Sequence, residues 1–226
     1  PPDLVRRWLA VDALMNAARP EPARLSELVA DSAAALTRLA PRVSIVINNH
    51  DYADYLGAAI ASALEQTRPA HEVIVVDDGS TDGSREVIAR FPAIRPVLKQ
   101  NGGQASALNA GFGAATGDLV VFLDADDRLL PEAVETLAAQ GLEGVARLSF
   151  GLETIDESGH PTGLFPMSRL AASGDVRGAL LAEGFLRMMP TSGNAFPRAT
   201  LERLLPIPEA PWRISADVYL VYGASF

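Results

Sequence analysis

The amino-acid sequence predicts an α/β fold in which a mostly parallel, Rossmann-like sheet is flanked by helices. Short apolar runs alternate with segments of helical periodicity, and strands that alternate with helices form βαβ units with right-handed crossovers. The runs are rich in Val, Ile, Leu and Phe, which is typical of parallel strands buried on both faces. Three of the runs stop abruptly at acidic or amide residues, so polar side chains are expected at the ends of buried strands.

The composition is that of a globular protein. The 226 residues are 48% hydrophobic and 21% charged, enough for one large domain with a substantial core. The absence of cysteine excludes disulfides and thiolate metal sites. A formal charge of −9 without a basic run argues against nucleic acid as a partner.

The sequence also bears on location. No apolar run approaches the roughly 20 residues that span a bilayer. No signal-peptide pattern begins the chain. We therefore expect a cytoplasmic protein without a transmembrane segment, which reaches the inner face of the membrane, if at all, through regions outside this sequence.

Residues 1–41 differ from the rest of the chain. Two amphipathic segments are separated by Pro20 and Pro22, and Pro41 closes the second. We expect a helical extension or a linker there, and one main domain over residues 42–226.

The first half of the main domain shows the regular alternation. Strands are expected at residues 43–47, 73–76, 94–98 and 119–123. Helices are expected at residues 54–66, around 87–91 and at about 104–115, with Thr81 or Asp82 as the N-cap of the second.

The second half, residues 132–226, is less regular. Pro131 marks the start of a helix. The remaining expectations are a strand at 145–150 continued at 152–155, an extended loop or hairpin at 158–180, a polar turn at 191–194, a helix at about 198–205, and an apolar segment after Asp217.

Acidic and amide side chains follow three of the predicted strands: Asn48 and Asp51, then Asp77 and Asp78, then residues 124–127. If the strands are parallel, these ends share one edge of the sheet, where such sheets bind ligands. Neighbouring carboxylates repel one another and lose solvation at a buried strand end, and Mg²⁺ or Mn²⁺ removes both penalties. The sequence therefore predicts a metal–diphosphate site. A solvated acidic turn is the alternative for residues 124–127.

Other nucleotide and metal motifs are absent. Gly102-Gly103 is no dinucleotide fingerprint, and neither a P-loop nor a nucleophile elbow occurs. Residues 78–83 begin like a calcium-binding loop, but a strand precedes them and Ala89 stands where that loop needs glutamate.

Five ordered motifs within residues 42–131 point to a known family. They occupy residues 43–47, 62–67, 72–84, 101–103 with 109–111, and 117–118 with 122–127. In this order and spacing they resemble the nucleotide-binding half of a family 2 glycosyltransferase, and the resemblance implies the GT-A fold. Downstream, residues 191–194 and 215–217 are similar to the family's acceptor-side turn and to the position of its catalytic acid. The resemblance implies that residues 132–226 form an acceptor half, truncated at its C-terminal end.

The resemblance also implies roles at the sheet edge. Asp78 would accept a hydrogen bond from the N3–H of a pyrimidine base, and Asn48 and Asp51 would lie in the same nucleotide site. Asp124 would approach the ribose, and loop amides near Gly103 would approach the nucleotide. The loop after the first strand departs from the family's usual Pro-Thr-Tyr-Asn pattern.

Metal and base roles follow from the same resemblance. Asp126 would bind the Mn²⁺ or Mg²⁺ that bridges the donor's diphosphate. Asp217 would be the general base that takes the proton from the acceptor hydroxyl. A helix N-cap is the alternative interpretation of Asp217.

Three functional hypotheses result. The leading one is metal-dependent, inverting transfer of a hexosyl group from a nucleotide-diphospho-sugar, with a UDP-sugar favoured, to a hydroxyl of a glycan, lipid-linked or protein acceptor in glycan or polysaccharide synthesis. The second is a non-catalytic relative that binds a nucleotide or a glycan and serves as an assembly module. The third, a sugar-phosphate nucleotidyltransferase, would need a glycine-rich phosphate loop with a basic residue after the first strand, and residues 48–51 supply neither.

Overall fold

The structure, a computed structural model, describes residues 40–156, 158–165, 174, 176–183 and 189–226. The chain divides into two compact units, Pro1–Ala40 and Pro41–Phe226. The helical extension predicted for the first unit therefore lies outside the described residues.

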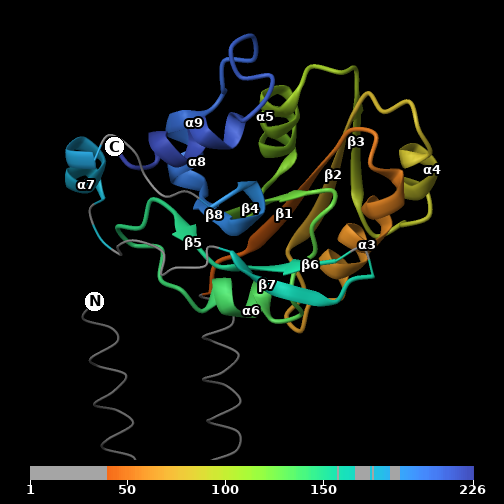
Figure 1. The fold of residues 1–226 in the computed structure, drawn as a ribbon, viewed down its shortest axis with the longest axis horizontal. Coiled ribbons are helices and arrows are strands. Elements are labelled where there is room, and N and C mark those ends of the chain that lie inside the picture. The colour runs from red at the N-terminus through yellow and green to blue at the C-terminus, as the bar shows by residue number, and fades with distance from the viewer. Residues whose placement is uncertain (1–39, 157, 166–173, 175, 184–188) are drawn as a thin grey trace, which may run out of the picture. The chain divides into compact units, whose positions relative to one another are not determined.

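The second unit is built on a six-stranded sheet of order β3-β2-β1-β4-β8-β5 (Figure 1). Its four parallel strands are β1 (Val43–Asn49), β2 (Glu72–Asp78), β3 (Arg95–Lys99) and β4 (Leu119–Asp124). Antiparallel to β4 runs β8 (Asn194–Pro197), which pairs in turn with β5 (Leu148–Ser149). A mainly parallel sheet with flanking helices confirms the predicted fold class.

The remaining elements connect and cover these strands. The helices of the described residues are α3 (Ala53–Leu64), α4 (Ser84–Ile88), α5 (Gln104–Ala114), α6 (Ala133–Ala138), α7 (Arg177–Glu183), α8 (Arg198–Leu204) and α9 (Ala216–Gly223), with a 3-10 helix, η1, at Thr191–Gly193. A separate hairpin is formed by β6 (Leu152–Ile155) and β7 (Pro161–Phe165). None of these helices is long and apolar enough to cross a membrane.

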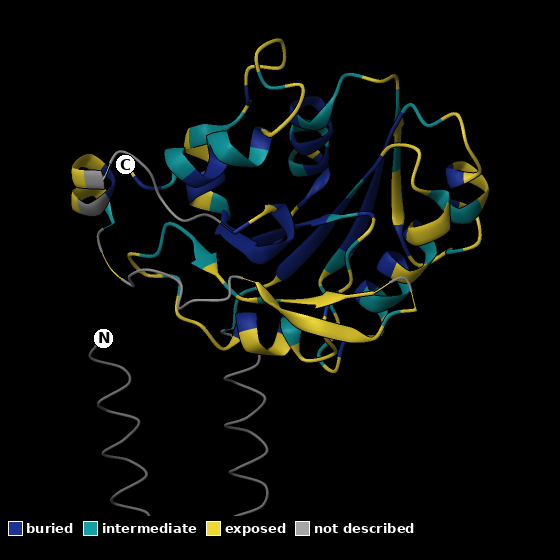
Figure 2. Ribbon diagram, in the orientation of Figure 1, coloured by how far each residue is buried: buried dark blue, intermediate teal, exposed yellow. Residues whose placement is uncertain are grey.

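The core lies on both faces of the central strands, which are buried along their length (Figure 2). On one face, Val76 and Phe122 pack in a hydrophobic cluster with residues of α5, α8 and α9. Helix α5 approaches this face closely because Gly111 has no side chain, and a Cβ there would overlap Val46. Side chains alternate along a strand, so Ile45 and Ile47 point to the other face, toward α3.

The connection between β5 and β8 begins and ends at neighbouring points of the sheet. Ser149 pairs with Asn194, and Phe150 N donates a hydrogen bond to Gly193 O (3.0 Å). The chain therefore leaves the sheet at residue 150 and returns at residue 193. The hairpin of β6 and β7 and the helix α7 belong to this connection.

The second half departs from the sequence prediction in three places. The strand expected at 145–150 is reduced to β5, and the helix α7 begins within the range 158–180, where an extended loop or hairpin was expected. The expected polar turn at 191–194 is η1 followed by β8, a strand that was not predicted. In the first half, the N-cap of α4 is Gly83, while Asp82 Oδ1 accepts a hydrogen bond from Ser84 N (2.9 Å).

Candidate functional site

Three buried parallel strands end side by side at one edge of the sheet. Asn48 of β1 lies opposite Asp124 of β4 and opposite Val76 of β2. Asp78 lies two residues beyond Val76, and side chains alternate along a strand, so Asn48, Asp78 and Asp124 share one face. This is the face of α5 and α9, because Val76 belongs to their hydrophobic cluster. The predicted convergence of polar strand ends is confirmed.

The opposite face carries a carboxylate that serves the fold. Asp77 is fully buried, and its carboxylate accepts hydrogen bonds from Arg85 Nε (2.8 Å) and Asn49 Nδ2 (3.2 Å). Burial by itself would raise the pKa of Asp77, but hydrogen bonds from Ser80, Arg85 and Asn49 outweigh burial and lower it. Asp77 is therefore a charged structural group.

Asp124 lies among other acids. Burial, then the charges of Asp127 and Asp126, raise its pKa to about 7, and the charge of Asp217 adds to the rise. A hydrogen bond from the Thr191 hydroxyl works in the opposite direction. Because crowding and burial disfavour the charged form, a cation that neutralises the carboxylates would stabilise the site.

The 3-10 helix η1 borders Asp124. Asp124 N donates a hydrogen bond to Ser192 Oγ (3.0 Å), and Thr191 and Ser192 are both buried. Burial is also the main reason that the pKa of Asp127 is raised, although a hydrogen bond with Ser192 lowers it. The hydroxyls of η1 thus hold both acids in place.

Asp217 comes to this cluster from the second half of the chain. It is the second residue of α9, and Ser215, with a left-handed φ of 58°, occupies the N-cap position. The interpretation of Asp217 as a helix N-cap is therefore wrong. Burial raises the pKa of Asp217, and its charge acts on Asp124. A half-buried carboxylate of this kind is suited to accept a proton.

Asp124 and Asp126 could bind a cation that is also coordinated by oxygen atoms of a bound ligand. Within the described ranges, no three His, Asp or Glu side chains lie close enough to form a complete metal site. Mg²⁺ usually takes one or two protein carboxylates and fills its shell with water and phosphate oxygens. Asp126, exposed in the turn after β4, and the crowded Asp124 match that requirement.

The carboxylate of Asp78 is buried and accepts hydrogen bonds from three donors of the chain. Lys99 Nζ donates to Oδ1 (2.5 Å), and the backbone amides of Gly102 (3.0 Å, to Oδ1) and Gly103 (2.7 Å, to Oδ2) donate as well. Only 3% of Asp78 is exposed. A carboxylate has about four acceptor sites, so these three donors leave room for one more. Asp78 anchors the loop before α5, and its reading of a base stays a prediction.

Asn48 has unused hydrogen-bonding capacity. Its Nδ2 and Oδ1 are buried and have no partner among the described residues. A buried polar group without a partner costs roughly 1–3 kcal/mol, so a ligand that bonds to this amide is favoured. Asn48 is therefore a candidate contact for a ligand at the sheet edge.

Two further predicted residues have partners within the chain. Asp51 is exposed, and its Oδ1 accepts hydrogen bonds from Thr81 N (2.6 Å) and Asp82 N (3.3 Å), which joins the loops after β1 and β2. Gly103 has a φ of 88°, and a Cβ there would lie 2.7 Å from Arg213 O. The roles of Asp51 and Gly103 toward a nucleotide remain predictions.

Sequence reasoning missed residues that support the site. Lys99 ends β3 in register with Asp78, so the pairing of neighbouring parallel strands could have identified it. Gln104 accepts a hydrogen bond from Ala216 N (2.8 Å), 112 residues away, and no local pattern signals such a contact.

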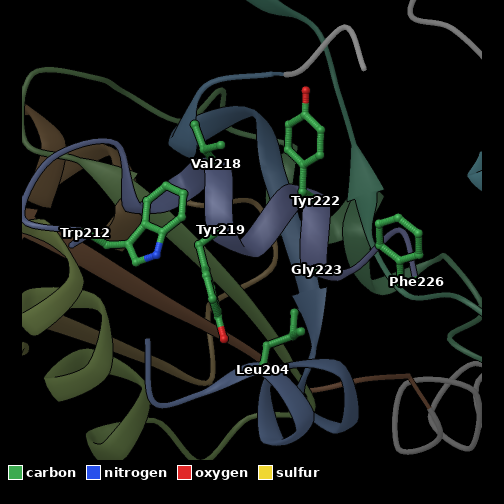
Figure 3. A pocket seen from close by; sticks show the side chains of 7 residues that line it. All are labelled: Leu204, Trp212, Val218, Tyr219, Tyr222, Gly223 and Phe226. Carbon is green, nitrogen blue, oxygen red and sulfur yellow. The ribbon is translucent and has the colours of Figure 1, made fainter. Parts of the chain in front are cut away.

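An apolar groove of about 490 Å³ lies beside α9 (Figure 3). Trp212 and Tyr219 meet edge to face there, with ring centroids 5.7 Å apart. The groove is lined by Leu204, Trp212, Val218, Tyr219, Tyr222, Gly223 and Phe226. Helix α9 thus carries Asp217 in its first turn and forms one wall of the groove.

The sequence resembles known glycosyltransferases. Residues 44–146 match the family model described as glycosyl transferase family 2. The uncharacterized glycosyltransferase alr2836 of Nostoc sp. is 38% identical over 195 residues, which make up 82% of this chain and 60% of the relative. The chain therefore spans 60% of that relative's length, which is less than two thirds.

Solved structures have the same fold. TarS of S. aureus, residues 1–349, matches with a TM-score of 0.62 at 20% identity, and its complex with UDP with a TM-score of 0.58 at 18% identity; each match covers 81% of this chain and 55% of TarS. The mannosyltransferase PcManGT from Pyrobaculum calidifontis, in complex with GDP-Man and Mn²⁺, matches with a TM-score of 0.51 at 25% identity and covers 76% of this chain and 48% of PcManGT.

Proposed function

We propose that this chain, which matches glycosyltransferase family 2 in sequence and the GT-A glycosyltransferases in fold, transfers a sugar from a nucleotide-diphospho-sugar to a hydroxyl group of an acceptor. The observation that carries the proposal is the convergence of Asp124, Asp126 and Asp217 at the carboxyl end of a parallel sheet. Ligands bind at this end of open α/β sheets. The acids come from both halves of the chain, as a site between donor and acceptor requires.

The donor half is proposed to bind the nucleotide across the ends of β1, β2 and β4. The amide of Asn48, unpaired among the residues that the structure describes, supports a polar ligand there, and Asp78 has room for one more donor such as a pyrimidine N3–H. TarS binds UDP and PcManGT binds GDP-Man. On this basis a nucleoside diphosphate is the proposed leaving group, and UDP is favoured because Asp78 would accept from uracil.

Asp126 is proposed to hold a divalent cation with the donor's diphosphate, and Asp124 to lie beside it near the ribose. PcManGT carries Mn²⁺ with its donor, which supports a cation of this class. When bound, the cation would stabilise the negative charge that develops on the leaving diphosphate. The raised pKa of Asp124 is consistent with a group whose charge needs such a partner.

Asp217 is proposed to be the general base. The acceptor oxygen attacks the anomeric carbon as the bond from that carbon to the diphosphate oxygen breaks, and Asp217 takes the hydroxyl proton. The products are the glycosylated acceptor and the nucleoside diphosphate. Attack from the side opposite the leaving group inverts the anomeric centre, and burial of Asp217 brings its pKa closer to that of an effective base.

The deciding experiment is a transfer assay on the full-length protein with UDP- and GDP-sugars, Mn²⁺ and a panel of hydroxyl acceptors, analysed by mass spectrometry. A product heavier than the acceptor by one sugar, with release of one nucleoside diphosphate, is the expected result. Donor binding without transfer to any acceptor would favour a non-catalytic assembly module. Release of pyrophosphate from a nucleoside triphosphate and a sugar phosphate would favour a nucleotidyltransferase.

A further inference from the structure

Gln104, the first residue of α5, bonds to two other segments of the site, residues 213–216 and the start of η1. Its Oε1 accepts a hydrogen bond from Ala216 N (2.8 Å), and its Nε2 donates to Thr191 Oγ1 (3.3 Å). Its own backbone N–H donates to Arg213 O (2.8 Å). Because Ala216 opens α9 and Thr191 opens η1, a single side chain bonds to the first residue of each element.

The bond to Ala216 takes the place of a helix cap. The first N–H groups of a helix have no acceptor within it. Ser215 holds the N-cap position but makes no side-chain cap bond, so Gln104 supplies the acceptor from another helix. Asp217 follows Ala216 directly, and the bond therefore fixes the backbone from which Asp217 projects.

The bond to Thr191 connects the same side chain to Asp124. The Thr191 hydroxyl lies near the Asp124 carboxylate and lowers its pKa, against the larger effect of burial. Gln104 thus contacts Ala216, which precedes Asp217, and Thr191, which lies near Asp124. The charge of Asp217 acts on Asp124, so the two acids are close. Gln104 is also linked to the proposed nucleotide site, because the amides of Gly102 and Gly103, immediately before it, donate hydrogen bonds to Asp78.

We propose that Gln104 is a positioning residue that sets Asp217 against Asp124 and the donor, and this inference rests on the proposed role of Asp217 as the base. It contacts no reacting atom and acts through Ala216 and Thr191. Loss of Gln104 is therefore expected to lower kcat, because a displacement of about 1 Å at a reacting group can lower the rate about a hundredfold.

The test compares Gln104→Met with a matched control, Gln66→Met. Methionine keeps the length of glutamine and removes its hydrogen bonds. Gln66 makes equivalent bonds elsewhere in the chain, since its Oε1 accepts from Val134 N (2.9 Å) and its Nε2 donates to Leu130 O (2.9 Å). Both variants lose bonds to the backbone, but only Gln104→Met loses those next to Asp217 and Asp124.

Two readouts are taken on the full-length protein. The first is amide hydrogen exchange at Ala216 without substrate, which is expected to be about tenfold faster or more in Gln104→Met and unchanged in Gln66→Met. Gln104→Glu keeps an acceptor for Ala216 and should retain the protection. The second is kinetic: Gln104→Met should lower kcat about tenfold or more while KM for the donor stays within about twofold.

Unchanged exchange at Ala216 in Gln104→Met, or a kcat close to that of the wild type, would overturn the proposal. Gln104→Asn, one methylene shorter, should give the same losses and replaces the methionine variant if that variant does not fold. A wild-type protein that transfers no sugar counts against the proposed function instead. The exchange experiment then still decides whether Gln104 holds the start of α9.

Discussion

Asn48 and Asp124 lie opposite one another where β1 and β4 end: an amide with no hydrogen-bond partner in the described part of the chain faces a carboxyl group whose pKa is raised to about 7. Each arrangement is unfavourable in the free protein, because buried polar groups need hydrogen bonds and buried acids resist ionisation. A ligand that bonds to the amide and brings a cation to the acids relieves both. A nucleoside diphosphate with its metal ion has this combination of properties.

We predict that nucleotide binding depends on a divalent cation through Asp126. Asp126→Asn keeps the shape and removes the charge of a ligand, so UDP with Mn²⁺ should bind at least about tenfold more weakly, or about 1.4 kcal/mol. Titration calorimetry on wild type and variant measures the difference. Asp54→Asn, at an exposed acid in the first turn of α3, is the control and should bind normally. Equal affinities for wild type and Asp126→Asn, or wild-type binding that survives a chelator, would contradict the assignment.

We predict that Asp78 makes the protein prefer UDP over CDP. Uracil N3 carries a hydrogen that the carboxylate can accept, whereas cytosine N3 is itself an acceptor and would face it without a donor. A preference of about tenfold or more is expected in calorimetry. If CDP binds as tightly as UDP, the three donors that already contact Asp78 complete its bonding, and its function is to anchor the loop before α5.

We predict that Asp217→Asn lowers kcat by roughly 10² to 10⁴ while nucleotide affinity stays nearly unchanged, because a general base acts in the transition state. A base must be deprotonated, and burial raises the pKa of Asp217. Wild-type kcat should therefore fall as the pH drops through this raised pKa, above the value of about 4 for an exposed carboxyl. A pH–rate profile and a binding titration test both parts. An Asp217→Asn variant with normal kcat would remove Asp217 from the mechanism.

We predict that Asp77 stabilises the fold in its charged form. Its pKa is lowered in the folded state, so its contribution is complete above the unfolded-state pKa and is lost as the pH falls through the folded-state pKa. Asp77→Asn should lower the free energy of unfolding by about 1–3 kcal/mol at pH 7, and by less once the acid is protonated in the wild type. Urea denaturation at pH 7 and pH 3 provides the comparison. A loss that is the same at both values would point to a steric cause.

We predict that Gly103→Ala disrupts the start of α5, whereas Gly113→Ala in the same helix does not. Gly103 has a left-handed φ of 88°, and a Cβ would press against Arg213 O at 2.7 Å. A Cβ at Gly113 would meet no atom within 4 Å, and alanine there should stabilise the helix by roughly 0.5–1 kcal/mol. Thermal denaturation should show opposite shifts. A neutral Gly103→Ala would mean that the segment around Arg213 yields easily.

The first half of the main domain could be predicted because local pattern and tertiary structure agree there. The apolar runs at 43–47 and 119–123 coincide with β1 and β4, since a strand buried on both faces has few residue types available. The second half could not be predicted as well. β8 is only four residues long and is defined by its partners β4 and β5, which the local sequence does not reveal.

The site follows the same division. Asn48, Asp78 and Asp124 could be placed together because a parallel arrangement brings strand ends to one edge. The contacts that hold them could not, because Gln104 bonds to Thr191 and Ala216, which are distant in the sequence. The start of α9 was mispredicted for a similar reason. Ser215 and not Asp217 is its N-cap residue, and the acceptor for the first helix amide comes from Gln104 of α5.

The closure of the chain between residues 150 and 193 has an evolutionary consequence. Ser149 and Asn194 are fixed as neighbours in the sheet, so the fold holds the two ends of the connection between them. Each doubling of a loop's length adds only about 0.6 kcal/mol of closure entropy. Insertions and deletions before η1 should therefore have little effect on the parallel strands, whereas Thr191 and Ser192 must stay beside the acids that β4 carries.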